Sequence, residues 1–377
     1  MLTRGGARSA AWAGAVDVRA CIRLGLVGAA LALGLLLLAV IASPAPPPNS
    51  PLGGYTTPYT PSRDGFDVML NHADGQAYAT LAQDPTLSRP QAFVEGAPQA
   101  ANFGARPLLP YLLFVGSLGR PGWIPPAFVA IEALAGGLLV VGAAAVLQSM
   151  GRRDQDRLAL AVLLLPGAQL GLVLLGQDVL ALGFALVGLV LLAGRRYAPL
   201  LAALAFTAAG LTRETALIAL GLAVLHEWWG RGPRRRDVWL VVPFVAYAGW
   251  NEFSAHRLGA RSGAGVASNL AWPFTGLVRA AGHWDPVGGL AVALLLVLVV
   301  VSLVRRTDSL LTWLTVGFLA ATTISAEAVW HSWQSGVRVS LPVTVFALLN
   351  LRLPATIQHA LTRKRVPMGA GPSPRAG

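Results

Sequence analysis

The residues best suited to chemistry lie in the only long polar interval of an otherwise apolar sequence, between the first apolar segment and all later ones. This interval carries the carboxylates Asp67, Asp74, Asp84 and Glu95, and it closes on Arg106 just before another apolar segment. A carboxylate beside low-dielectric lipid can become a useful general base, and an arginine can hold a phosphate through two parallel hydrogen bonds. The interval therefore predicts chemistry on a polar substrate held near lipid.

Asp74 is the candidate general base, since an Asp followed by Gly favours a turn close to the expected lipid surface. The alternative interpretation is an Asx-turn without a catalytic role. Asp67 could orient Asp74, bind a metal or have no role. Asp84 precedes Pro85, which is typical of a helix end or a turn. We therefore assign catalysis to Asp74, with Asp67 as the second carboxylate.

Three arginines have two interpretations each. Arg106 precedes Pro107 at the start of a short apolar segment, and Arg338 lies at the start of the last one. An arginine at a membrane interface commonly extends its charged head toward water, but its planar fork also suits a phosphate. Arg213 and Glu214 adjoin at the tip of a predicted helical hairpin. There they either pair with one another and fix the tip, or contact a substrate.

The elements that must position these residues are membrane spans. Of the 377 residues, 55% are hydrophobic and only 12% are charged, about half the charged fraction of a soluble domain. Repeated apolar runs of about 15–25 residues can each cross a bilayer, and a helix satisfies its own backbone polar groups there. The net charge of +12 comes from short arginine clusters between these runs. That pattern indicates a lipid bilayer as the partner, and no nucleic acid.

The sequence predicts an all-α polytopic membrane protein with about ten transmembrane helices and one short re-entrant or interfacial helix, Pro107–Leu118. The predicted spans are Leu24–Ala42, Ile124–Leu147, Leu158–Leu175, Val179–Ala193, Pro199–Gly210, Ala216–Trp229, Val238–Phe253, Val287–Val304, Leu310–Ile324 and Val337–Leu351. Residues 1–42 would form a cytoplasmic N-terminus and first anchor, 43–123 an outer catalytic loop with the interfacial helix, 124–353 a multi-span core, and 354–377 a basic cytoplasmic tail.

The predicted spans sort the polar residues. Placing both termini in the cytoplasm puts most of the 29 basic residues on the inner side of the plasma membrane, as the positive-inside rule requires. Five polar sites then project to the outer side: the segment around Asp74, Gln177-Asp178, Arg213-Glu214, His256–Pro286 and Glu327–Arg338. Because ionisable groups at membrane depth are costly and usually functional, their convergence predicts a site on the outer face.

Four motifs carry a resemblance to a known family: ADGQAY at 73–78, ARPLLPYLLF at 105–114, LLGQDVLAL at 174–182 and GLTRETALIAL at 210–220. With the order of spans around them, they resemble the GT-C class of polytopic membrane glycosyltransferases over roughly residues 67–230. Within this class, the chain is similar in particular to bacterial members that take part in forming cell-surface glycopolymers. It implies a GT-C-like fold and inverting transfer of a hexose or pentose. The donor would be a polyprenyl-phosphate sugar, and the acceptor a glycan or a lipid-linked molecule.

The resemblance also implies roles. Asp74 matches the acidic base of the first outer loop, Arg106 matches an arginine before the next apolar segment, and Gln177 and Arg213 match polar positions at hairpin tips. The expected phosphate-binding residues are Arg106, Arg213 and Arg338, and the expected substrate-binding residues are Gln76, Tyr78, Gln177, Asp178 and Glu214. Asp64, Asp67 and Asp74 do not form the acidic pair common in this class. The resemblance therefore does not decide whether the protein uses a divalent metal cofactor.

A secondary transporter or a flippase of lipid-linked sugars is the alternative from another class. Transporters place ionisable residues near mid-membrane at broken helices, whereas most charges here lie at the ends of predicted spans. Glu132, alone within a span, is the exception. A scaffold subunit without chemistry is a third interpretation. The sequence has no phosphate-binding loop, no GxSxG motif and no Cys/His metal pattern.

Overall fold

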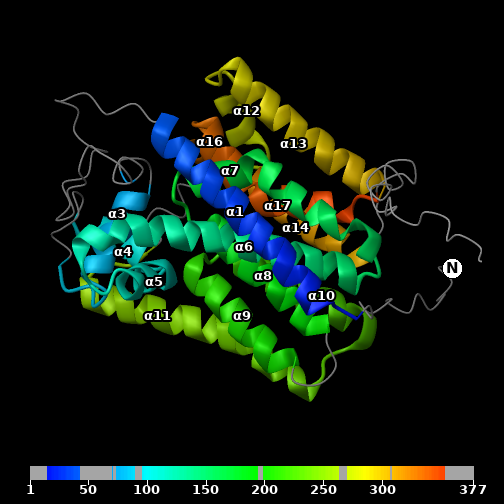
Figure 1. The fold of residues 1–377 in the computed structure, drawn as a ribbon, viewed down its shortest axis with the longest axis horizontal. Coiled ribbons are helices and arrows are strands. Elements are labelled where there is room, and N and C mark those ends of the chain that lie inside the picture. The colour runs from blue at the N-terminus through cyan, green and yellow to red at the C-terminus, as the bar shows by residue number, and fades with distance from the viewer. Residues whose placement is uncertain are drawn as a thin grey trace, which may run out of the picture.

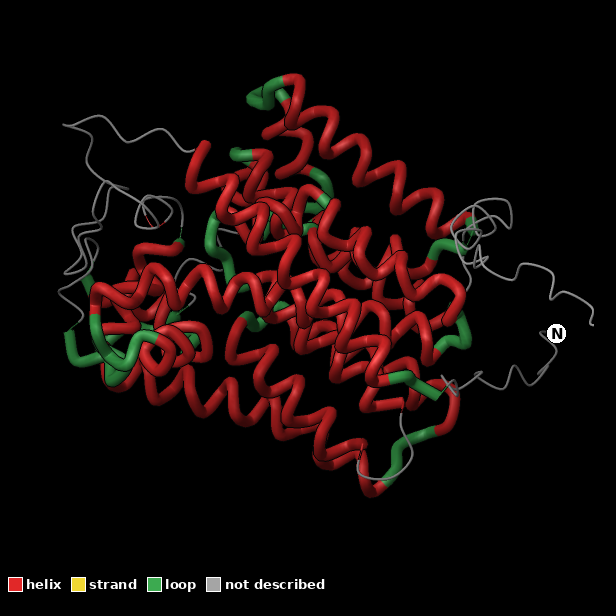
Figure 2. The backbone as a smooth tube through the Cα atoms, viewed as in Figure 1, coloured by secondary structure: helices red, strands yellow, loops and turns green. Residues whose placement is uncertain are grey.

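A computed structural model of the chain describes residues 15–42, 70, 74–89, 96–193, 198–262, 270–305 and 308–352. Within these ranges the fold is helical and contains no strand, apart from an isolated bridge between Leu270 and Ser325 (Figure 2). The predicted all-α class is therefore confirmed for the described residues. Asp67, Glu95 and the basic tail lie outside them.

The helices of the first half are α1 (Val18–Ala42), α3 (Gly75–Gln83), α4 (Ala97–Gly104), α5 (Leu108–Gly116), η3 (Pro121–Trp123), α6 (Ile124–Ser149), η4 (Arg153–Leu164), α7 (Pro166–Val173) and α8 (Asp178–Ala193). Those of the second half are α9 (Ala198–Thr212), α10 (Ala216–Arg231), η5 (Arg235–Val241), α11 (Val242–Leu258), α12 (Thr275–Ala281), α13 (Pro286–Val304), α14 (Ser309–Thr323), α15 (Glu327–Trp330), α16 (Trp333–Val339) and α17 (Leu341–Asn350). The η segments are 3₁₀ helices.

The centre of the bundle is α6, which packs against α1 on one side and α8 on another (Figure 1). Small residues bring α1 and α6 together. A Cβ added to Gly137 would lie 2.8 Å from the carbonyl oxygen of Gly25, and one added to Gly28 would lie 2.7 Å from a Val140 methyl group. Glycines at such positions let two helix backbones approach closely, as is common between membrane helices.

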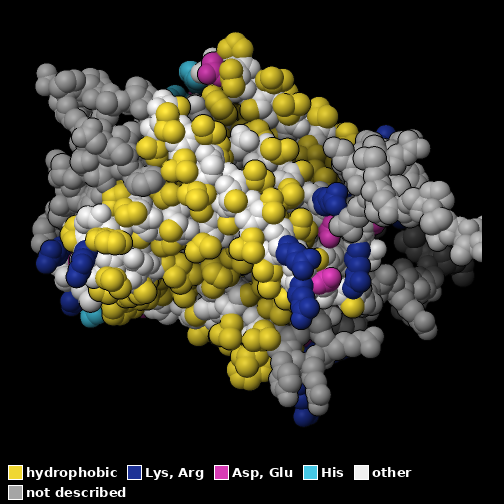
Figure 3. Space-filling model, viewed as in Figure 1, with side chains coloured by type: hydrophobic (Ala, Val, Ile, Leu, Met, Phe, Trp, Pro, Cys, Tyr) yellow, Lys and Arg dark blue, Asp and Glu magenta, His cyan; other side chains and the backbone are white. Residues whose placement is uncertain are grey.

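Three described helices are long and apolar enough to cross a membrane: α1, the continuous segment Pro121–Ser149, and α13. The bent pair η4 and α7 would make a fourth if it counts as one span. Much of the apolar surface of α1 and α13 is exposed, and apolar side chains cover the middle of the face in Figure 3. These helices indicate a membrane protein. The predicted ten spans are not confirmed, since five further apolar helices are shorter.

Three predicted spans are not single α-helices. Val238–Phe253 begins in the 3₁₀ helix η5 and continues as α11. Leu158–Leu175 is instead a 3₁₀ helix and an α-helix that meet at 56°. Leu165 is extended there (ψ 130°), because the ring of the following Pro166 disfavours helical backbone at the residue before it. Val337–Leu351 is broken at Ser340, between α16 and α17. Pro342 lacks the amide hydrogen that would continue the helical ladder from α16.

The short helix predicted at Pro107–Leu118 is present as α5. It has nine residues, which is far below the number needed to span a bilayer. It packs against α3 and α6, and its Tyr111 hydroxyl donates to the Pro85 carbonyl at 2.9 Å. At its C-terminal side the chain reverses through Leu118 and Gly119, both with positive φ. The helix therefore lies beside the polar interval.

The bundle has two chemically different ends. We call one of them the "basic end"; Asp17, Arg152, Asp308 and Asn350 lie there. The Asp17 backbone amide donates to the Gln148 side-chain oxygen, and the Asp308 backbone amide donates to the Asn350 side-chain oxygen. Arg152 donates to the Leu349 carbonyl at 2.6 Å. Figure 3 shows most of the visible Lys and Arg side chains gathered at its right-hand side, near the start of α1 in Figure 1. The opposite ends of α6, α8 and α17 bring the predicted site residues together.

Candidate functional site

Arginines and carboxylates alternate at this second end, which we call the "paired end". Arg338 Nη2 lies 3.1 Å from Asp74 Oδ2, and Arg338 Nε lies 3.4 Å from Asp178 Oδ2. The other Asp178 oxygen lies 2.5 Å from Arg213 Nη1. Asp178 is thus shared by two arginines, and a chain of charges runs from Asp74 to Arg213.

A second ion pair lies beside the first chain. Arg106 donates from Nε and Nη2 to the two carboxylate oxygens of Glu214, both at 2.8 Å. Two parallel hydrogen bonds of this kind combine charge with fixed geometry. With its amide oriented to satisfy its neighbours, Gln177 donates to the Thr212 carbonyl at 2.9 Å and accepts from Arg106 Nε at 3.2 Å. Gln177 therefore joins this pair to the tip between α9 and α10.

Each charged residue lies at the end of a helix. Asp74 precedes α3, Asp178 begins α8, Arg213 and Glu214 separate α9 from α10, and Arg338 is near the end of α16. These ends meet because α6 and α8 pack in the centre and the shorter helices surround them. Gly176 leaves the room that the cluster needs. A Cβ there would lie 3.2 Å from Asp178 Oδ2 and 3.4 Å from Arg338 Nη1.

Burial sets the electrostatics of this end. Burial alone would raise the pKa of Glu214, but the adjacent Arg106 charge and its hydrogen bonds lower that pKa to about 2. Burial likewise opposes the charge of Arg106, yet Glu214 holds the pKa of Arg106 well above its usual value. The pKa of the Tyr78 hydroxyl is raised, chiefly by burial. At neutral pH Arg106 and Glu214 are therefore fully charged and Tyr78 is neutral.

A small pocket with a cavity volume of about 20 Å³, partly open to solvent, adjoins Asp178 and Arg213. Its remaining wall is almost entirely apolar and comes from α8, α10, α14 and the α16–α17 region: Ala181, Leu182, Ala216, Ala219, Phe318 and Pro342 are among its residues. The pocket thus combines one polar edge with an apolar interior. That combination suits an amphiphile whose charged group meets the arginine and whose apolar part lies along the apolar wall.

Two predicted substrate-binding residues, Gln76 and Tyr78, are buried and do not line this pocket. Tyr78 is fully buried, packs edge-to-face on Phe103 with ring centroids 5.5 Å apart, and places its hydroxyl within 2.8 Å of Gln177. Gln76 is also buried, and its carbonyl accepts from the Thr80 hydroxyl at 2.9 Å. Their visible contacts are with the protein. The more exposed carboxylates of the paired end are Asp74 and Glu214, with 23% and 33% of their side chains accessible.

The remaining predicted residues have clear outcomes. The Asp84 carboxylate accepts from Ser88 Oγ at 2.7 Å and from the Arg89 amide at 2.6 Å, so the interpretation of Asp84 as a turn residue is confirmed. The interpretation of Arg213 and Glu214 as an internal pair is wrong, because each forms its ion pair with a residue from another segment. Packing of α8 and of the α4–α5 connection against the hairpin tip provides those partners.

Two features were not included in the site predicted from the sequence. Glu132 is fully buried in α6, neither carboxylate oxygen has a hydrogen-bond partner, and it lies within electrostatic range of Asp178. Its position in an apolar run was the only sequence signal. The second feature is a group of His283, Glu327 and His331. The sequence shows no Cys/His metal pattern here, because these residues come from two separate segments.

Comparison of the chain with protein-family models, with curated proteins and with solved structures finds no match.

Proposed function

We propose that this protein is a membrane glycosyltransferase acting at the paired end of the bundle. It would move a hexose or pentose, with inversion, from a polyprenyl-phosphate donor to a glycan or lipid-linked acceptor. The observation that carries the proposal is the apolar pocket with Arg213 and Asp178 at its edge. A polyprenyl phosphate is an amphiphile of this kind, because its phosphate needs arginine and its tail needs an apolar surface.

The charge pattern supports a role for Arg338 in coupling donor binding to base release. Arg338 holds Asp74 through one contact and Asp178 through a longer one, so its guanidinium can shift from Asp74 to an incoming phosphate. That exchange would leave the Asp74 carboxylate free to accept a proton. Arg213, at the edge of the pocket, would contact the same phosphate. Arg106, with both oxygens of Glu214 on its fork, would act by positioning the hairpin tip.

In the reaction, the acceptor hydroxyl oxygen forms a bond to the anomeric carbon while the bond from that carbon to the phosphate oxygen breaks. The acceptor proton passes to Asp74, and the electron pair of the broken bond leaves with the phosphate. Arginine charges that are already oriented stabilise the phosphate as negative charge develops on it, without reorganising at that moment. No residue needs to change oxidation state.

The direct test measures transfer of a labelled sugar from a prenyl-phosphate donor by the purified protein in proteoliposomes. Asp74→Asn keeps the size of the side chain and removes the proton acceptor, so turnover should fall about 10²–10⁴-fold. Asp84→Asn is the matched control, since Asp84 is engaged in its own turn. Equal activity of both variants would remove Asp74 as the base, and absence of transfer by the unaltered protein would remove the proposal.

The proposed orientation has both termini in the cytoplasm of a cell with this protein in its plasma membrane, and the paired end outside. Reporter fusions after Arg153 and after Arg236 should then both report a cytoplasmic location. Most basic clusters of the sequence would lie on that side, as the positive-inside rule requires. An outer signal at either fusion site would contradict the orientation.

A flippase or secondary transporter of lipid-linked sugars is the second candidate. One observation favours it: Glu132 is an unpaired acid inside the long central helix, where transporters carry functional ionisable groups. Glu132→Gln should then abolish movement of a fluorescent prenyl-linked sugar between the leaflets of proteoliposomes. If the protein is a glycosyltransferase, neither the Glu132→Gln variant nor the unaltered protein would accelerate movement of the prenyl-linked sugar between the leaflets.

A further inference from the structure

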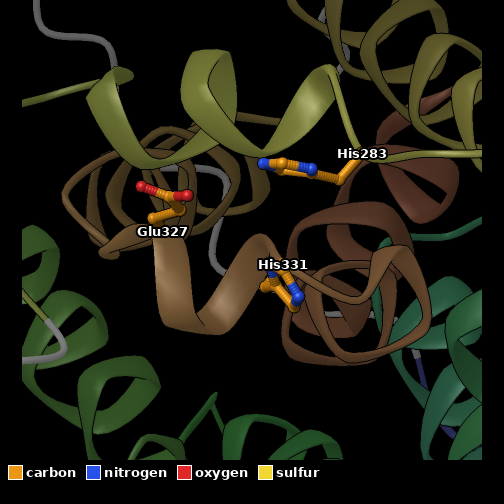
Figure 4. Close-up of side chains that lie close together, drawn as sticks. All are labelled: His283, Glu327 and His331. Atoms are coloured by element: carbon orange, nitrogen blue, oxygen red, sulfur yellow. The ribbon is translucent and has the colours of Figure 1, made fainter.

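Three side chains that could ligate a metal lie close together, and none of them takes part in the ion pairs of the paired end. His283 follows α12, Glu327 begins α15 and His331 follows the last residue of α15 (Figure 4). One ligand atom from each lies within 4.8 Å of the other two. The two histidines are exposed and Glu327 is partly buried, so an ion from solution can reach them.

The two segments that carry these residues are held together by contacts that do not involve the ligand atoms. The Ala271 amide donates to the Ile324 carbonyl at 2.8 Å, and the Phe274 amide donates to the Thr323 carbonyl at 2.7 Å. Next to His283, Trp284 Nε1 donates to the Trp330 carbonyl at 2.8 Å. The backbone on both sides of the cluster is therefore fixed before any ion binds.

Two features bring the side chains into register. Glu327 and His331 are four residues apart on one helical turn, and the His331 amide donates to the Glu327 carbonyl at 2.6 Å, so both side chains project on the same face. Gly276 of α12 lets the other segment approach, because a Cβ there would lie 2.6 Å from the carbonyl carbon of Ala326. His283 is thereby brought opposite that face, as Figure 4 shows.

We propose that His283, Glu327 and His331 bind a Zn²⁺ ion, with a fourth position open to water or another exogenous ligand. Two imidazoles and one carboxylate are a common ligand set for zinc sites that keep an open position. Ligands about 2.0–2.1 Å from a tetrahedral ion lie roughly 3.3 Å from one another. Closing the cluster thus requires only side-chain rotation, which the exposed histidines allow. The imidazoles disfavour Mg²⁺ and Ca²⁺, which prefer oxygen ligands.

Such an ion would brace a functional part of the molecule. It would tie the α12–α13 connection to α15, and α15 leads directly into α16, which carries Arg338. The proposal does not depend on glycosyl transfer, because binding is measured without turnover. Because the ion would bind the folded protein and not the unfolded chain, it would also raise the thermal unfolding temperature.

The test uses the full chain, purified in lipid nanodiscs with an affinity tag that contains no histidine, and stripped of metal with a chelator. Calorimetric titration with Zn²⁺ should show one saturable site. The variants His283→Ala, Glu327→Gln and His331→Ala should each weaken Zn²⁺ binding more than about 100-fold. Loss of a residue that only supports a metal ligand through a hydrogen bond typically costs about 10–100-fold. His256→Ala is the control: His256 is an exposed histidine near the end of α11, and this variant should bind Zn²⁺ like the unaltered protein.

A second variant keeps the proposal testable if an alanine variant fails to fold. His331→Cys replaces one zinc ligand with another, so it should retain a single site and, with Co²⁺, gain a thiolate-to-metal charge-transfer band. The unaltered protein should lack that band, since its only cysteine, Cys21, is buried in α1. The proposal would be overturned if the unaltered protein had no saturable Zn²⁺ site, or if His256→Ala weakened Zn²⁺ binding as much as the other variants do. It would also be overturned if Co²⁺ added to the His331→Cys variant gave no charge-transfer band.

Discussion

The two ends of the bundle hold their arginines in opposite ways. At the basic end, Arg152 donates to the carbonyls of Leu349 and Leu351 and to the Gln155 amide, all of them neutral acceptors. Burial, with the nearby Arg352 charge, lowers the pKa of Arg152 to about 10. At the paired end Arg106 is largely buried, with 16% of its side chain exposed, but Glu214 raises its pKa.

The difference concerns what each arginine can do next. An arginine held by backbone carbonyls keeps its net positive charge and joins helix ends, which suits an anchor. An arginine held by a carboxylate is already neutralised, and a phosphate can compete for it by exchange. This difference supports the proposal that an anionic ligand binds at the paired end and releases a carboxylate in the same step.

The largest expected effect is that of Asp178→Asn. The Asp178 side chain is only 6% exposed and is the shared counter-charge of Arg213 and Arg338, so its loss leaves two largely buried arginines under-compensated. We expect the free energy of unfolding to fall by about 3–5 kcal/mol. Thermal unfolding in nanodiscs would measure it. At the basic end, Arg152→Met should cost less, about 1.5–3 kcal/mol for a charge-assisted hydrogen bond, and equal losses would break the comparison.

A smaller effect is expected from Arg106→Lys. Lysine keeps the charge but cannot form two parallel hydrogen bonds with Glu214. The unfolding free energy should fall by about 1.5–3 kcal/mol. A double-mutant cycle with Glu214→Gln sharpens the result, since two residues in direct contact should show a coupling energy of about 0.5–3 kcal/mol. Additive losses would mean that the pair contributes nothing of its own.

Arg338→Lys separates binding from stability. If Arg338 exchanges Asp74 for the donor phosphate, a lysine should weaken binding of a prenyl phosphate about 10-fold, equivalent to about 1.4 kcal/mol. Arg152→Lys at the basic end should leave that affinity unchanged. Titration of a prenyl phosphate into both variants by calorimetry would measure it, and equal affinities would assign Arg338 to structure alone.

A further difference concerns acid. The pKa of Glu214 is lowered in the folded protein from its usual value near 4.5 to about 2, so its ionised form is favoured by folding. Its contribution to stability is complete above pH about 4.5 and is lost as the pH falls toward about 2. Thermal unfolding followed across this window should show a decline that Glu214→Gln lacks. An identical decline in that variant would assign the acid sensitivity to other carboxylates.

Much of the helical structure was predictable because it depends on local pattern. The apolar run at 287–304 became α13, the short run at 107–118 became α5, and the polar tips at 177–178 and 213–214 lie together as the topology required. The apolar pattern gave a wrong prediction where a proline interrupts a helix. Pro166 and Pro342 each broke a run whose hydrophobicity alone predicts one helix.

By itself, the sequence determined that the chain is helical, that some helices can enter a membrane, and which polar residues stand at helix ends. Only the tertiary structure decided which charges meet: Arg106 with Glu214, 108 residues apart, and Arg338 with Asp74, 264 residues apart. It also assembled His283 with Glu327 and His331 from two segments. Apolar periodicity acts over a few turns of one helix, whereas an ion pair or a ligand set depends on how distant helices pack.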